Sequence, residues 1–376
     1  MTIAVNFVAL FSDAPQNMKW YWWKIMTGMA YQQNGNRYIF IIQDKDALLE
    51  QYVPENIQLV KVQNKISNAL SRYLWLQRKL PALLKAHQCQ LVVHTDFTFI
   101  PRIDIQQTVV LDVLPNQAPA TWRSKKANTY FKKYSQQILA QAKVIFTASS
   151  DVALQLESIL NPQAQQLMLI PLLIEQGTQI LNWHQLQDVK TTYTGTYEYF
   201  LYAGSIGANS NLINLLKAFS LFKIRQRSNM KLVVLADEEA YDTQFETQLE
   251  TYKYRSDIVL LKDIPDHKTA PIYAAAYAFV YPVLYCNYPY YALKAMRAGL
   301  PVICSNTGAL EAISDDLVLK ANVAMPEDLA QKMMWLFKDE TTRTTFIDTA
   351  TPWIENCTPE TAINLISSKL LIGYNQ

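Results

Sequence analysis

The chain has 376 residues, of which 50% are hydrophobic and 18% are charged, and its formal net charge is +2. This length suits two domains with sizeable cores, and the composition excludes a disordered chain. The small net charge gives no whole-molecule case for nucleic-acid binding, so no nucleic-acid partner is expected. The four cysteines form no C-x-x-C pair, which predicts free thiols in a reducing compartment and no metal site.

The N-terminus, MTIAVNFVALF, begins directly with a strand-like pattern. It has no basic region and no small-residue cleavage site, so a signal peptide is not predicted. No stretch approaches the roughly 18 consecutive apolar residues that a membrane-spanning helix requires. We therefore expect a cytoplasmic protein. The chain holds only 9 glycines, which makes glycine-rich phosphate loops scarce.

The first half of the chain alternates apolar runs of strand length with segments of helix length. This alternation predicts a doubly wound parallel sheet covered on both faces, in a domain over residues 1–175. Residues 161–198 are rich in Gln, Thr and Asn with weak periodicity, and we place the linker at 176–198. The predicted strands lie at 3–10, 38–42, 57–62, 90–94, 108–111 and 143–147.

The same alternation restarts at Tyr199 and predicts a second α/β domain over residues 199–350. A helical segment at 351–376 is expected to cross back to the first domain. Two α/β domains that face each other form a cleft, and ligands of open α/β sheets bind at the carboxyl ends of the strands. The predicted strands begin at Tyr199 and lie at 231–236, 257–261, 278–282 and 301–305.

Three segments of the second domain carry a specific pattern of strands, turns and helix starts. They are FLYAGSIGANSNLINLLKAF at 200–219, the stretch 259–285 that ends in VYPVLY, and ALKAMRAGLPVICSNTGALEAI at 292–313. In their order and spacing they resemble the donor domain of family 4 glycosyltransferases, the glycosyl transferases group 1. More weakly, 108–115 and 142–157 are similar to segments of the family's first domain. The resemblance implies a GT-B fold, in which two doubly wound Rossmann-like domains face each other across a cleft.

The resemblance also implies an activity. The second domain would hold a nucleoside diphosphate sugar and the first would offer a glycan or lipid-linked acceptor, in a retaining transfer that needs no metal or further cofactor. The diphosphate that leaves is anionic, so its site needs cations, helix N-termini or backbone NH groups. The donor-binding positions that follow from the resemblance are Gly204, Ser205, Gly207, Ser210, Asn211, Tyr285, Cys286, Asn287, Lys294, Asn306, Thr307 and Gly308.

The donor site departs from the family pattern at four of these positions. The basic pair of the family aligns with Ser205 and Ser210, neither of which carries a charge. The two family glutamates, eight residues apart, align with Cys286 and Lys294. The paired acceptors for sugar and ribose hydroxyls are therefore missing.

The acceptor side departs as well. The histidine of the family's His-Asp pair aligns with Leu111, which leaves Asp112. The family's glycine-rich loop after the first strand is here SDAPQNMKW at 12–20, without glycine. His94, at the end of the QLVVH run, is placed where a cleft residue is expected, although a lone histidine is as often a structural hydrogen bonder. Asp112 and His94 are the catalytic candidates on this side.

Two interpretations compete. In the first, the chain is a divergent glycosyltransferase in which Lys294 binds the diphosphate and Ser205, Ser210 and Asn211 donate hydrogen bonds. In the second, it is a catalytically inactive glycosyltransferase-like subunit that acts as a binding or assembly partner of another protein. The first is favoured, because most chains with this fold-level similarity are enzymes, although fold alone does not fix function. The YCNYPYY stretch fits either a stacked base or sugar, or an aromatic cluster that fills the cleft.

Two segments suggest a peripheral contact with the inner face of the membrane. The first helix carries the aromatic run Trp20–Trp23, and a predicted helix at 122–134 carries a basic run, Arg123–Lys133. Aromatic and basic side chains suit a membrane interface and anionic lipid. The alternatives are burial of Trp22 and Trp23 against the first sheet and an ordinary solvated helix face.

Overall fold

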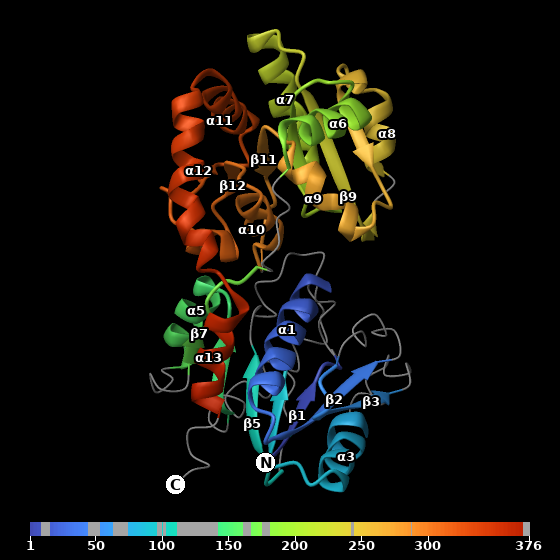
Figure 1. The fold of residues 1–376 in the computed structure, drawn as a ribbon, viewed down its shortest axis with the longest axis vertical. Coiled ribbons are helices and arrows are strands. Elements are labelled where there is room, and N and C mark those ends of the chain that lie inside the picture. Colours follow the sequence, from blue (N-terminus) through green and yellow to red (C-terminus); the bar gives the residue numbers. More distant parts are fainter. Residues whose placement is uncertain are drawn as a thin grey trace. The chain divides into compact units, whose positions relative to one another are not determined.

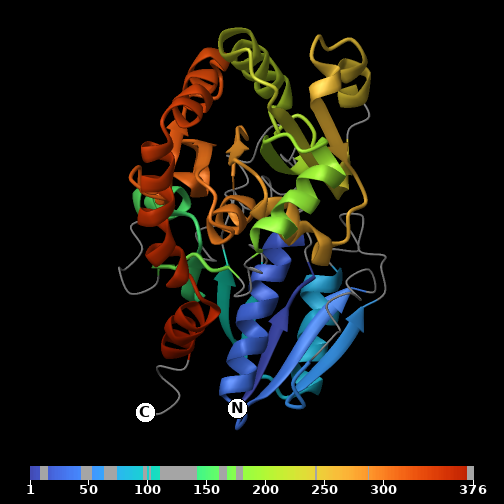
Figure 2. The same cartoon turned by 45° about the horizontal axis from the view of Figure 1, so that its top comes forward.

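The computed structural model of the protein describes residues 1–8, 16–43, 53–62, 74–95, 100, 103–110, 142–160, 167–174, 181–241, 244–286 and 288–370. The chain divides into two compact units, residues 1–173 with 358–376 and residues 174–357. Each unit is built on its own parallel sheet with helices packed against it (Figures 1 and 2). Within the described ranges, no helix combines the length and the apolarity that a bilayer span requires.

The first unit has a sheet of seven parallel strands in the order β3-β2-β1-β4-β5-β6-β7. This confirms the predicted doubly wound sheet and adds β7, which the sequence patterns did not indicate. The strands are β1 Thr2–Asn6, β2 Arg37–Gln43, β3 Ile57–Val62, β4 Leu91–His94, β5 Gln106–Val110, β6 Ala142–Thr147 and β7 Leu167–Leu169. The helices are α1 Gln16–Gln32, a π-helical turn Trp75–Lys79 that continues into α3 Leu80–Ala86, α5 Ser150–Leu160 and α13 Pro359–Leu370.

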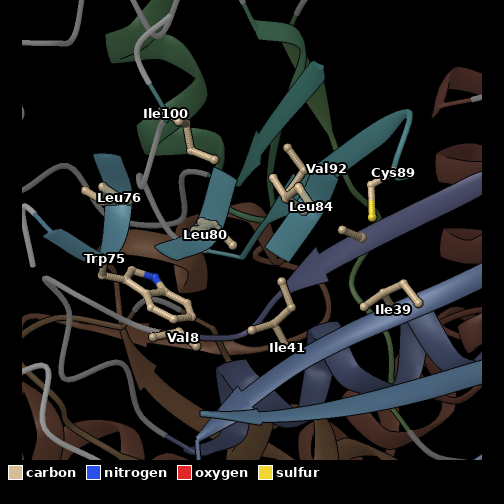
Figure 3. Close-up of a cluster of buried hydrophobic side chains, with 11 residues drawn as sticks. Val8, Ile39, Ile41, Trp75, Leu76, Leu80, Leu84, Cys89, Val92 and Ile100 are labelled. Carbon is tan, nitrogen blue, oxygen red and sulfur yellow. The ribbon is translucent and has the colours of Figure 1, made fainter. Parts of the chain in front are cut away.

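Alternate residues of β2 face opposite sides of this sheet, as the strand geometry requires. Ile39 and Ile41 belong to a buried cluster with Trp75 and Leu80 from the helical segment that contains α3 (Figure 3). Phe40 points to the other face, where its ring centroid lies 5.2 Å from that of Trp23 in α1. Burial of these large apolar side chains on both faces stabilises the three-layer arrangement.

The aromatic run on α1 is part of this core. Tyr21, Trp22 and Trp23 are all buried, because the helix packs them against the sheet and against each other. The expectation that they contact a membrane is therefore wrong for these three residues. The side chain of Trp20 and the basic run Arg123–Lys133 lie outside the described part of the chain.

The second unit has six parallel strands in the order β10-β9-β8-β11-β12-β13. The strands are β8 Tyr199–Ile206, β9 Lys231–Tyr241, β10 Ile258–Leu261, β11 Ala278–Tyr281, β12 Val302–Ser305 and β13 Leu319–Ala321. The helices are α6 Trp183–Thr194, α7 Leu212–Gln226, α8 Gln244–Glu250, α9 Asp266–Ala274, α10 Tyr290–Arg297, α11 Pro326–Lys338 and α12 Glu340–Glu355, with short 3-10 segments at Arg255–Asp257 and Gly308–Ala312.

Helix α6 lies within the range 176–198 that the sequence predicts as linker. Asn182 caps its amino end through the backbone NH of Gln185, and the Gln185 side chain bonds back to Asn182. Gly195, with a φ of 66°, ends the helix in the left-handed conformation, as glycine does at many helix ends. These end signals are present in the sequence, but weak apolar periodicity between them hides the helix. The second unit begins at residue 174 and ends at 357, which differs from the predicted range 199–350.

Candidate functional site

The strand order of the second sheet reverses between β8 and β11, so the connections from these neighbouring strands leave in opposite directions. At such a switch point the carboxyl ends of the strands open into a crevice that commonly binds ligands. The loops that follow β8, β11 and β12 start at this edge. All the described donor-binding candidates lie in these loops, at the end of β8, in α10 or at the start of the Gly308–Ala312 segment.

Near its end, β8 contains a glycine that few other residues could replace. Gly204 has a φ of 140°, and a Cβ there would lie 3.4 Å from a ring atom of Tyr291. The carbonyl oxygen of Ser205, the next residue, accepts a hydrogen bond of 2.7 Å from the hydroxyl of Tyr202. The backbone is therefore held close to the tyrosine rings at the end of the strand.

Ser210 and Asn211, both expected to meet the donor, are engaged within the protein. Ser210 is 3% exposed, and its hydroxyl donates to the Gly207 carbonyl at 2.6 Å. Asn211 has a φ of 56°, and its Nδ2 donates to the carbonyls of Pro282 at 3.0 Å and Val323 at 2.8 Å. Both side chains therefore fix loop conformation, and Asn211 joins the loops that follow β8, β11 and β13.

The loop after β11 is held against the start of the 3-10 segment Gly308–Ala312. The Ala309 backbone NH donates to the Cys286 carbonyl at 2.7 Å. Gly308 has a φ of 58°, and a Cβ there would lie 2.2 Å from the same carbonyl oxygen, so only glycine fits. Burial, with the nearby Cys304 adding to it, raises the pKa of the Cys286 thiol. This position therefore presents a neutral group where the family has a carboxylate.

Lys294 lies on α10 with its ammonium turned towards α9. Its Nζ donates to the hydroxyl of Thr269 at 2.8 Å. The same atom lies 5.4 Å from the ring centroid of Tyr273 and 5.8 Å from that of Tyr290, within the range of cation–π attraction. These contacts link α9 to α10, whereas the sequence-based interpretation directs the ammonium to a diphosphate.

The tyrosines of the 285–291 stretch form part of a wider aromatic group. Tyr288 is buried, and the ring centroids of Tyr291 and Tyr281 are 6.0 Å apart. Tyr290 and Tyr291 pack edge to face at 5.4 Å. This packing resembles a core cluster more than an open stacking platform.

The remaining donor candidates follow β12. Asn306 is exposed and Thr307 is half-buried, with its hydroxyl 3.1 Å from that of Ser305. Asn287 lies outside the described residues. In the described parts of the three loops, residues 207–211, 282–286 with 288–289, and 306–307, no side chain is Asp, Glu, Lys or Arg.

His94, at the end of β4, is part of a buried hydrogen-bond network in the first unit. Its Nε2 lies 3.1 Å from Oε1 of Gln107, and its Nδ1 lies 3.4 Å from Nδ2 of Asn6. The Gln107 Oε1 can only accept a hydrogen bond and the Asn6 Nδ2 can only donate one. The geometry therefore fits a neutral His94 ring that is protonated on Nε2. Burial lowers the pKa of His94 to about 4, although the Gln107 hydrogen bond acts the other way.

This network also fixes Ile100, because the Gln107 amide bonds both the NH and the carbonyl of that residue at 2.9 Å. With both ring nitrogens occupied and 0% exposure, His94 has no atom available to an acceptor hydroxyl. Sequence reasoning missed Asn6 and Gln107, which carry no motif. Asp112 lies outside the described residues. Within the described ranges, no group of His, Cys, Asp or Glu side chains could hold a metal ion.

Comparisons with known proteins extend over both units. Residues 185–353 match the family described as Glycosyl transferases group 1. The O-antigen chain mannosyltransferase B of Escherichia coli is 24% identical over 331 residues, 81% of this chain and 86% of that protein. The crystal structure of WaaG, a glycosyltransferase involved in lipopolysaccharide biosynthesis, has a TM-score of 0.73 and 14% identity, covering 99% of this chain and 100% of that chain. Anabaena HepE in complex with UDP-glucose has a TM-score of 0.72 and 14% identity, covering 99% of both chains.

Proposed function

We propose that the chain, whose residues 185–353 match the glycosyl transferases group 1 family and whose fold is GT-B, transfers a sugar from a nucleoside diphosphate donor to a glycan or lipid-linked acceptor. Two relatives support the substrate classes. The mannosyltransferase from Escherichia coli is named for its action on an O-antigen chain. The HepE structure holds UDP-glucose.

The observation that carries this proposal is the convergence of three loops at the switch point of the second sheet. Gly204 and Gly308 both have positive φ angles there. The backbone of Gly308 meets that of Cys286 so closely that no side chain fits. Glycines at positive φ let the backbones of neighbouring loops approach closely, and such loops at the carboxyl edge of an open α/β sheet are typical of a binding site.

The described loops would bind the diphosphate without ion pairs. Ser205 supplies a hydroxyl, and Asn306 and Thr307 supply exposed or half-buried polar groups. No side-chain hydrogen bond caps the amino end of α7 in the described structure. The positive dipole end of this helix would attract the phosphate oxygens. Such a site depends on oriented dipoles, so its affinity should vary little with salt.

A second candidate function is that of a catalytically inactive subunit that binds a partner protein. One observation favours it. Both positions of the family glutamates hold groups that cannot act as carboxylates, because Cys286 is a buried thiol and Lys294 is a cation engaged with Thr269. A site that keeps its architecture but lacks these groups would bind a ligand without transferring it.

Isothermal titration of the full chain with UDP-, GDP- and dTDP-sugars tests the first step. We expect one nucleotide class to bind, and the product of transfer to a glycan acceptor to appear by mass spectrometry. Binding without transfer to any acceptor would favour the inactive subunit. If none of these nucleotide sugars binds, the donor-site proposal is wrong.

A further inference from the structure

Asn209, in the loop after β8, contacts the loop after β11 through three hydrogen bonds. Its side-chain Nδ2 donates to the Tyr285 carbonyl at 2.9 Å, and its Oδ1 accepts from the Tyr285 NH at 3.0 Å. Its own carbonyl accepts from the NH of Leu284 at 2.9 Å. We refer to these three bonds between Asn209 and residues 284–285 as the Asn209 clamp.

The Asn209 clamp connects the chain segments after β8 and β11 beyond the point where the two strands stop pairing. The register between β8 and β11 pairs Ala278 with Phe200 and Phe279 with Leu201, and Asn209 follows only after the chain has left the strand. A carboxamide has the same donor and acceptor as a peptide group, so one asparagine can satisfy both main-chain groups of Tyr285. The loop is therefore attached as if a further strand residue paired with it.

The same loop is fixed on both sides of the clamp. Before it, the Pro282 carbonyl accepts from Asn211. After it, the Cys286 carbonyl accepts from Ala309 and packs on Gly308. Residues 282–286 are thus held at three successive points. All of these bonds involve main-chain atoms of the loop, so they set its path rather than the rotamers of its side chains.

We propose that Asn209 is a positioning residue for the donor site, and that the clamp holds the loop of residues 282–286 in the course that it needs to border the nucleotide sugar. This inference rests on the proposed glycosyltransferase function. Neither residue 285 nor 286 carries a charge that could draw a donor in by itself. Their contribution depends on location, which is what the clamp supplies.

Three variants separate the parts of the clamp. Asn209→Ala removes both side-chain bonds and leaves the main-chain groups of Tyr285 without these partners. Asn209→Asp keeps an acceptor for the Tyr285 NH but places a carboxylate against its carbonyl. Asn56→Ala is the matched control, because Asn56 is a similarly half-buried asparagine of the first unit whose side chain donates two hydrogen bonds, to the carbonyls of Ala30 and Asn36.

The experiment combines hydrogen exchange of the unliganded chain with titration of whichever nucleotide sugar the wild type binds. We expect Asn209→Ala to speed exchange at the Tyr285 amide and to weaken donor binding by roughly tenfold, the effect of losing about two ordinary hydrogen bonds. Asn209→Asp should weaken binding as well, and Asn56→Ala should change neither measurement. In a transfer assay, KM should rise more than kcat falls.

Different outcomes overturn different statements. If exchange at Tyr285 is unchanged in Asn209→Ala, the clamp does not order the loop. If exchange rises but the donor binds as in the wild type, the loop is ordered but does not serve the donor. If the wild type binds none of the nucleotide sugars, the proposed function itself fails, and that titration shows it without any variant.

Discussion

Replacing His94 should remove much of the acid sensitivity of the first unit. Burial lowers the pKa of His94 from 6.5 to about 4 in the folded chain. Between these values the unfolded chain binds one more proton than the folded one, so stability falls as pH falls through this window. At 1.36 kcal/mol per unit of pKa, the full loss is about 3 kcal/mol, of which about 2 kcal/mol appears between pH 7 and pH 5.

The variant for this test is His94→Gln. It loses hydrogen bonds to Asn6 and Gln107 and will be less stable at every pH, so the informative quantity is the change between pH 7 and pH 5. Urea unfolding, monitored by hydrogen exchange of peptides from residues 1–173, gives the change in unfolding free energy between pH 7 and pH 5 for the unit that contains His94. His87→Gln, at the half-exposed end of α3, is the control.

We expect the stability of the wild type and of His87→Gln to fall by about 2 kcal/mol more than that of His94→Gln between the two pH values. If His94→Gln keeps the wild-type slope, the ring is not held neutral in the folded state. The assignment of His94 to a structural network would then be wrong, and an acid–base role on the acceptor side would need to be considered again.

Three further changes test other parts of the second unit. Gly308→Ala should abolish donor binding and lower the free energy of unfolding by at least about 2 kcal/mol, because the added Cβ meets the Cys286 carbonyl. Calorimetric titration and thermal unfolding measure the two effects. The control Gly35→Ala, where a Cβ meets nothing within 4 Å, should change neither donor binding nor stability. Asp257→Asn should cost about 2 kcal/mol in urea, since it weakens the ion pairs to Lys223 and Lys231, which are only partly exposed. Burial raises the pKa of Asp257, but these two lysines hold it below its usual value, so the wild type should lose this contribution as pH falls through the folded pKa and the variant should not. Lys294→Met should lower the melting temperature through lost contacts with Thr269, and weaker donor binding at low salt would show that the ammonium also serves the diphosphate.

The fold follows from local patterns because strands buried on both faces appear as continuous apolar runs. This holds for β1, β2, β4 and β6 of the first unit and for the central strands of the second, whereas the edge strand β3 exposes Gln58 and Lys61. Three elements were missed for physical reasons, among them strand β13, which has only three residues. Strand β7 also has only three residues, too short for a pattern, and most side chains of α6 are exposed or half-buried, so its apolar periodicity is weak.

The sequence predicted which loops form the candidate site, but it did not predict the hydrogen-bond partners of their side chains. Asn209 bonds a residue 76 positions away, and Asn211 bonds one 112 positions away. No local pattern encodes such partners, so the inward direction of Ser210, Asn211 and Lys294 could not be read from their neighbours in sequence. The sequence already showed that charge is lost at Ser205, Ser210 and Cys286 and that its sign is reversed at Lys294. What the structure adds is how the side chains at these positions are engaged.

The clamp on the β11 loop has a consequence for how this surface can change over evolution. Asn209 and Ala309 bind the peptide groups of residues 285 and 286, so mutations of those two side chains leave the anchors in place. A lineage can therefore exchange a glutamate for a cysteine at 286 while the loop keeps its course. Substitutions at Asn209 or Gly308 have no such freedom. The side chains of the site can therefore change while the course of the loop stays the same. An active transferase and a protein that only binds the ligand can then have the same backbone structure.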